Sequence, residues 1–81
     1  MKPGRGEVWE RLGAPTEQSG SVNDPRTQQE HGVSWNEKWV YLAADGKTVE
    51  RVVLWNRYDL MGVFRIKPDG SAEAESFETT S

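Results

Sequence analysis

The run Val52-Val53-Leu54-Trp55 constrains the fold of this chain more than any other feature of its sequence. Alternation along a β-strand places Val52 and Leu54 on one face and Val53 and Trp55 on the other. Because both faces are apolar, we expect this strand to lie at the centre of a sheet with cover on both sides. The cover could be the segment 7–12, closure of the sheet into a barrel, or another subunit.

The supply of apolar side chains limits how much cover the chain can provide for itself. Its 81 residues suffice for one domain, and a domain of this size buries only about 60% of the surface that its unfolded chain exposes. Only 35% of the residues are hydrophobic, so the four tryptophans are the largest apolar resource. This scarcity favours a second subunit or a protein partner as the missing cover.

Turn signals divide the second half of the chain into strands. Asp45-Gly46 and Pro68-Asp69-Gly70 consist of residue types that favour tight turns. The segments around them are rich in β-branched and aromatic residues, and they predict strands at 35–42, 48–55, 60–67 and 72–77. The predicted fold is therefore mainly β, a small antiparallel meander of three to four strands, either open or closed into a barrel.

The side-chain pattern also predicts how the last two strands pair. A three-residue loop at 68–70 would pair Lys67 with Ser71. This register sets Arg65 opposite Glu73 and places apolar residues opposite one another on the other face. Opposite charges on one face and apolar groups on the other are what stable cross-strand pairing requires.

The first hairpin allows two registers. A three-residue loop at 44–46 would pair Tyr41 with Val49 and would set Trp35 opposite Trp55. A two-residue turn at 45–46 would instead exchange the faces of one strand. The sequence favours the first register and leaves the second open.

The first third of the chain contains few large apolar side chains, and residues 13–32 are rich in polar residue types. Such a segment buries too little surface to offset its ordering entropy, so we expect residues 1–33 to be largely irregular. One short helix is expected over 7–12, ended by Gly13, with a strand as the alternative. A second is expected over 26–31, after Asp24 as N-cap and Pro25. Residues 34–78 are then the sheet domain, and 79–81 a disordered tail.

Aromatic and arginine side chains of the predicted sheet are the candidate interaction residues. They are Trp35, Trp39, Tyr41, Arg51, Trp55, Arg57 and Tyr58. These residue types are enriched at binding hot spots, and aromatic faces also stack on sugar rings or bases. The alternative role of the rings is a core that replaces scarce aliphatic side chains, and the bend 56–59 has the alternative role of a plain connection.

The sequence lacks the residues that catalytic and metal sites usually need. It has no cysteine and one histidine, His31, so neither a thiolate site nor a histidine cluster can be assembled. Glu37 and Glu50 fall on neighbouring predicted strands, but an acid–base pair needs a pKa shifted by its surroundings. We therefore expect no enzymatic activity, no metal and no cofactor, and we expect His31 to be exposed.

The expected function is a small non-enzymatic interaction module that binds a protein partner or self-associates through an aromatic-rich sheet face. A carbohydrate or single-stranded nucleic-acid platform is the alternative, although the net charge of −3 disfavours nucleic acid. No apolar stretch approaches the ~20 residues of a membrane span, and no signal-peptide pattern opens the chain. We therefore expect a soluble, cytoplasmic protein without a membrane partner.

Overall fold

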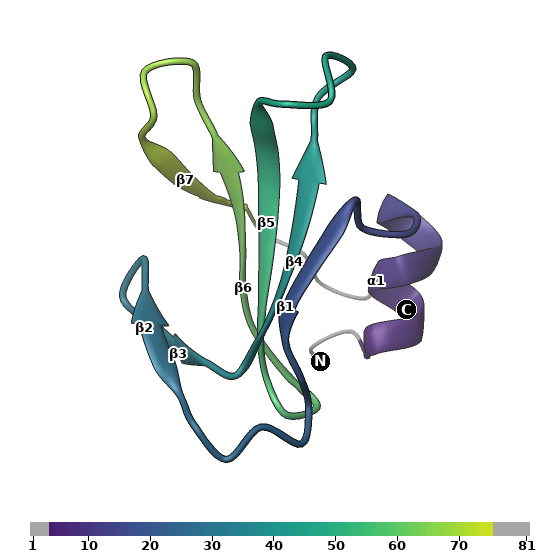
Figure 1. The fold of residues 1–81 in the computed structure, drawn as a ribbon, viewed down its shortest axis with the longest axis vertical. Helices are drawn as coiled ribbons and strands as arrows, with labels where there is room; N and C mark the ends of the chain where they lie inside the picture. Colours follow the sequence, from purple (N-terminus) through teal and green to yellow (C-terminus); the bar gives the residue numbers. More distant parts are fainter. Residues whose placement is uncertain (1–3, 76–81) are drawn as a thin grey trace.

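A computed structural model describes residues 4–75 of the chain, and within them the fold is mainly β, as the sequence predicts (Figure 1). The elements, in chain order, are α1 (Arg5–Leu12), β1 (Glu17–Gly20), β2 (Gln28–Glu30), β3 (Val33–Trp35), β4 (Glu37–Leu42), β5 (Val49–Asn56), β6 (Asp59–Ile66) and β7 (Ala72–Glu75). The helix predicted over 7–12 is thus part of α1, and Gly13 is its C-cap.

The main sheet is open and antiparallel, with the strand order β1-β4-β5-β6-β7. Strands β4 to β7 pair in sequence, which confirms the predicted meander. β1 pairs with β4 at one edge and β7 forms the other edge, so the sheet does not close into a barrel. β2 and β3 form a separate two-stranded hairpin.

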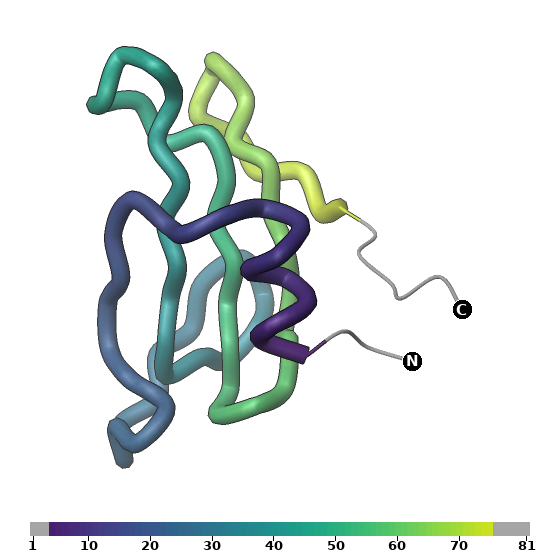
Figure 2. Tube along the Cα trace, turned by 90° about the vertical axis from the view of Figure 1, so that its right-hand side faces the viewer, coloured from purple at the N-terminus to yellow at the C-terminus, as the bar shows by residue number. Residues whose placement is uncertain are grey.

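The central strand β5 is covered on both faces by the chain's own elements. Val53 and Trp55 pack with Val8 of α1, and Val52 and Leu54 pack on the opposite face, together with residues of β3. Figure 2 shows α1 in front of the strands and the β2–β3 hairpin behind them. The four residues 52–55 are at most 3% exposed. The predicted two-sided cover is therefore confirmed, and the chain provides it without the second subunit that its composition suggested.

The segment before residue 34 is more regular than its composition predicts. β1 pairs with the edge of β4 although all four of its residues are exposed. Thr16 N donates to the carbonyl of Val40 at 2.8 Å just before this strand, and Ser21 N donates to the carbonyl of Asn36 at 3.0 Å just after it. An edge strand of this kind is held by backbone hydrogen bonds, which need no apolar side chain. Composition alone therefore did not predict β1.

The helix predicted over 26–31 is wrong. Asp24 accepts a hydrogen bond on Oδ1 from Arg26 N at 2.9 Å, but no helix follows it. Instead, residues 28–30 form β2, and His31 and Gly32 make the turn into β3 with φ angles of 55° and 82°. Two successive residues with positive φ are typical of a two-residue hairpin turn. The chain therefore reverses where a helix end was expected.

The predicted register of the β6–β7 hairpin is confirmed. Arg65 lies opposite Glu73, and Lys67 N donates to the carbonyl of Ser71 at 2.8 Å across the loop. Phe64 lies opposite Ala74 and Ile66 opposite Ala72 on the other face, as the sequence predicts. Residues 76–81, which include the predicted end of this strand and the predicted tail, lie outside the described residues.

The β4–β5 hairpin follows the second predicted alternative beside the loop, where Leu42 pairs with Val49, and matches neither alternative beyond the bulge. Tyr41 lies opposite Arg51 and not opposite Val49, because β5 contains one extra residue where the pairing shifts. The loop between β4 and β5 is held by Asp45, whose Oδ1 accepts hydrogen bonds from the backbone N–H groups of residues 47 and 48 at 2.8 and 2.9 Å. The displacement from the first predicted register is two residues, so the faces still match that alternative.

Candidate interaction surface

The sequence places four candidate rings, Trp35, Trp39, Tyr41 and Trp55, on one predicted aromatic platform, but the structure divides them between the two faces of the sheet. Trp39, Tyr41 and Trp55 belong to the cluster beneath α1, but Trp35 belongs to the cluster on the opposite face. Asn36 interrupts the predicted strand 35–42, because Trp35 ends β3 and pairs with β2 before β4 begins. The predicted pairing of Trp35 with Trp55 is therefore wrong, and the chain changes face at Asn36.

All four rings of the predicted platform are buried. Trp35 is 4% exposed, Trp39 2%, Tyr41 8% and Trp55 0%. A flat ligand needs a free ring face on which to stack. In this conformation the rings form a core, which is the alternative role that the sequence left open.

Arg51, another candidate, is held in an ion pair across the sheet. Its Nε lies 2.8 Å from Oε1 of Glu75, and its Nη2 donates to Oε2 at 3.4 Å. The hydrogen bond with Glu75 raises the pKa of Arg51. The guanidinium reaches past β6 and ties the central strand β5 to the edge strand β7.

A buried carboxylate, that of Glu37, fastens α1 to the sheet. Its side chain is 6% exposed, and its Oε2 accepts hydrogen bonds from Arg5 Nη2 at 2.8 Å and from Trp39 Nε1 at 2.6 Å. Burial by itself raises the pKa of Glu37, but the hydrogen bonds from Arg5 and Trp39 outweigh burial and hold the pKa below its ordinary value. The carboxylate is therefore ionised at neutral pH and acts as an anchor for Arg5.

Apolar and aromatic contacts complete the docking of α1. Val8 is 0% exposed, and the rings of Trp9 and Trp39 meet edge to face with centroids 5.6 Å apart. Arg5 Cζ lies 5.1 Å from the ring centroid of Trp39 and 5.3 Å from that of Trp55, within the range of cation–π attraction. Two donors of this interface, Trp55 Nε1 and Arg5 Nη1, are buried without a hydrogen-bond partner among the described residues.

The last two candidates, Arg57 and Tyr58, form the turn between β5 and β6 at the end of the sheet away from the β4–β5 loop (Figure 1). Tyr58 is 72% exposed. Arg57 has φ 57°, a left-handed conformation that is uncommon outside glycine. Asn36 Oδ1 accepts a hydrogen bond from Arg57 N at 2.8 Å, and the carbonyl of Val22 accepts one from Arg57 Nη1 at 3.0 Å. These bonds hold the turn in a strained conformation.

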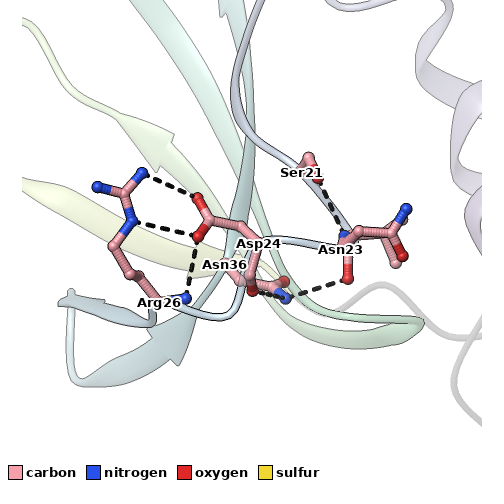
Figure 3. Close-up of polar contacts among 6 residues, drawn as sticks. Ser21, Asn23, Asp24, Arg26 and Asn36 are labelled. Atoms are coloured by element: carbon pink, nitrogen blue, oxygen red, sulfur yellow. Dashed lines mark hydrogen bonds and ion pairs between the residues drawn. The ribbon is translucent and has the colours of Figure 1, made fainter.

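Asn36 also contacts the loop 21–26, as Figure 3 shows. The residue is 3% exposed, and its Nδ2 donates to the carbonyls of Val22 and Asp24, both at 3.4 Å. Its backbone N donates to the carbonyl of Trp55 at 2.9 Å, and its own carbonyl accepts from Ser21 N at 3.0 Å. One buried amide therefore positions two loops and the start of β4.

The loop 21–26 is further fixed at its two ends. Gly20 precedes it with φ 73°, and a Cβ at this position would collide with the carbonyl of Asn36, so the close backbone approach requires glycine. At the other end Asp24 Oδ1 lies 3.3 Å from Arg26 Nε. Hydrogen bonds from the Arg26 backbone and side chain lower the pKa of Asp24. The loop is thus a well-defined support for the neighbouring turn.

The residues weighed for catalysis do not come together in the described part of the chain. Glu37 is engaged in the ion pair that holds α1, whereas Glu50 is exposed. His31 Nε2 lies 3.5 Å from Glu30 Oε2, and its ring packs on that of Phe64 at a centroid distance of 4.9 Å. Residues 4–75 contain no pocket and no group of three or more His, Asp or Glu side chains that could hold a metal ion.

Membrane-spanning helices among residues 4–75 and matches to known proteins are both absent. No helix within residues 4–75 is long and apolar enough to cross a bilayer. No protein family, curated protein or solved structure matches the chain.

Proposed function

We propose that this chain is a small non-enzymatic interaction module that binds a protein partner through the Arg57–Tyr58 turn. The observation that carries the proposal is the 72% exposure of Tyr58 at the tip of a turn whose backbone is fixed from behind by Asn36. Among the described residues, Tyr58 and Trp9 are the large hydrophobic side chains that remain exposed. The absence of cysteine is compatible with action in the reducing cytoplasm.

The chemistry of the turn indicates what kind of partner it fits. Tyr and Arg are enriched among the residues that contribute most to protein–protein binding. The ring of Tyr58 can fill an apolar pocket, while its hydroxyl and the guanidinium of Arg57 bond to acceptors at the pocket's rim. The expected partner surface is therefore an apolar pocket beside a carboxylate or free backbone carbonyls.

The fixed conformation of the turn supports the same proposal. A left-handed conformation destabilises a non-glycine residue by roughly 1–2 kcal/mol, which glycine at position 57 would avoid. The arginine is instead held by hydrogen bonds to Asn36 and Val22. A turn that is already ordered loses little conformational entropy on binding, so most of its contact energy remains available for affinity.

No observation favours the alternative, a platform for carbohydrate or single-stranded nucleic acid. That alternative needs several exposed tryptophan faces, whereas Trp9 alone among the four is more than 4% exposed. The net charge of −3 also repels a phosphate backbone.

The proposal is tested by comparing the full chain with two variants as immobilised baits. Tyr58→Ser removes the proposed anchor, and Lys47→Ser changes an exposed residue of the β4–β5 loop at the far end of the sheet. A candidate partner is a protein that the wild-type chain and Lys47→Ser retain and Tyr58→Ser does not. That protein is then purified, and its affinity for the three chains is measured by calorimetry.

The expected result is a loss of about 30-fold or more in affinity for Tyr58→Ser, the size of a hot-spot residue, and no change for Lys47→Ser. Thermal denaturation of the variants checks that both are folded. A purified partner that binds Tyr58→Ser as tightly as the wild-type chain would contradict the proposal. So would a set of retained proteins in which none depends on Tyr58.

A further inference from the structure

Helix α1 depends entirely on the sheet for its stability. It has eight residues, its N-cap is Gly4 without a side-chain hydrogen bond, and Gly6 lies within its first turn. A helix of this length and composition is not stable by itself in water. It is held by side chains, chiefly the fully buried Val8 and the ion pair of Arg5 with Glu37.

The connection between α1 and the sheet is a short hinge of three residues. The Tyr41 hydroxyl of β4 donates to the carbonyl of Gly13 at 2.9 Å. Leu12 ends the helix, and Thr16 N donates to the carbonyl of Val40 at 2.8 Å. Between them Gly13 adopts φ 80° and ψ −177°, a conformation open essentially to glycine alone. Pro15 favours an extended conformation for the residue before it. The docked position of α1 therefore depends on one unusual glycine conformation, which a straightened hinge would not need.

Two hydrogen-bond donors are buried where α1 contacts the sheet, without an acceptor in the described part of the chain. Arg5 Nη1 and Trp55 Nε1 are both buried there without a partner among residues 4–75. A buried donor without an acceptor is destabilising, and water satisfies it when the contact opens. Opening of α1 is therefore easier than the buried apolar surface alone would indicate.

We propose that α1 exchanges between two copies of this chain, so that each helix docks on the sheet face of the other copy. The face is formed by the aromatic side chains Trp39, Tyr41 and Trp55 with their apolar neighbours. A second copy is the occupant because its α1 carries the side chains already shown to fit: a guanidinium for the buried carboxylate of Glu37, and an apolar residue for the position of Val8. The side-chain contacts of α1 in the dimer repeat those in the monomer, and a straightened hinge no longer needs the positive φ of Gly13.

This inference is independent of the Arg57–Tyr58 turn, because α1 and that turn use different residues. It concerns self-association through the aromatic face of the sheet, whereas the proposed function concerns a different protein. Failure of one leaves the other standing, since Tyr58→Ser changes no contact of α1.

The deciding variant is Gly13→Ala. A Cβ at this position meets no atom within 4 Å, so the substitution acts on the backbone and not through a clash. Alanine is strained at the positive φ that residue 13 adopts when α1 is docked on its own sheet. It is not strained in a straightened hinge, in which residue 13 has an ordinary negative φ. Gly70→Ala is the matched control, because Gly70 also has a positive φ, 90°, and an open Cβ position but lies in the β6–β7 loop.

Sedimentation equilibrium at micromolar to high micromolar concentration measures the result. We expect the dimer dissociation constant of Gly13→Ala to fall by about tenfold or more relative to the wild-type chain, because strain is released at two hinges for each dimer. Gly70→Ala is destabilised equally in both states, so its dissociation constant is unchanged. A Gly13→Ala chain that melts earlier yet stays monomeric at these concentrations would overturn the proposal.

A second measurement identifies the contact that forms the dimer. In a refolded mixture of isotope-labelled and unlabelled chains, isotope-filtered spectra should show contacts between Trp9 of one copy and Trp39 of the other. A dimer in which these contacts occur only within one copy would reject helix exchange. If Gly13→Ala does not fold, the same mixture of wild-type chains at the highest soluble concentration decides, and the absence of contacts between copies overturns the proposal.

Discussion

Glu37 was a candidate acid in the sequence and is an anchor in the structure. Its carboxylate binds Arg5, which lies 32 residues earlier in the chain, and Trp39, which lies two residues later on the same face of β4. The contact with Trp39 follows from strand alternation, which the sequence shows. The contact with Arg5 depends on the path of the chain through β1, and that path was predicted to be irregular. The role of Glu37 was therefore beyond the reach of sequence alone.

Glu37→Gln should lower the free energy of unfolding at neutral pH by about 2 kcal/mol, because it removes the charge that Arg5 is bound to. The loss should depend on pH. The folded-state pKa of Glu37 is lowered, so its contribution is complete above the ordinary glutamate pKa and fades as the pH falls through the folded-state pKa. Urea denaturation between neutral pH and pH 3 should thus show the wild-type chain and Glu37→Gln converging on acidification.

Glu50→Gln is the control for this experiment, since it makes the same chemical change at an exposed glutamate. Its stability should follow that of the wild-type chain at every pH. Equal stability of Glu37→Gln and wild type at neutral pH would contradict the ion pair as described, as would a difference between them that is the same at all pH values.

At Asn36 the predicted alternation of faces fails. The alternation of Trp39, Tyr41 and Trp55 correctly placed these three rings on one face. Trp35 has the same parity as Trp39 and was placed with them, but the chain leaves the main sheet at Asn36. Its amide bonds to Val22, Asp24 and Arg57, which are distant in sequence, so the signal in the sequence was only a polar residue inside an apolar run.

At the scale of elements, the hairpins with strong turn signals were predictable and the polar strands were not. The loop 68–70 fixed both the turn and the register of β6 with β7. The β4–β5 register beyond the loop was missed because a bulge in β5 adds a residue between Val49 and Val52, and both predicted registers assumed regular pairing. β1 was missed because its pairing with β4 is a backbone interaction made by exposed, polar residues.

Gly6 offers a test of α1 as an element. It lies inside the helix, and an added Cβ would meet no atom within 4 Å. Gly6→Ala should therefore stabilise the chain by about 0.5–1 kcal/mol, since alanine loses less backbone entropy than glycine in a helix. Thermal denaturation should show a higher melting temperature than for the wild-type chain. An unchanged or lower melting temperature would mean that residues 5–12 are not helical in the folded protein.

At the scale of the whole molecule, two short elements bury the two apolar faces of the central strand β5. An eight-residue helix covers one face and a hairpin of two three-residue strands covers the other. The tryptophans make this possible, because Trp39 and Trp55 fill one cluster and Trp35 completes the second. The strand β5 therefore needs no partner for its cover.

Hydrogen exchange of the indole N–H groups, followed by NMR, tests this two-sided cover most directly. Trp55 and Trp35 lie on opposite faces, and the Nε1 atom of each is buried. Both indoles should exchange orders of magnitude more slowly than that of Trp9, which is 43% exposed. If either Trp35 or Trp55 exchanges as fast as Trp9 while the chain is folded, the corresponding face of β5 is open to water and the account is wrong.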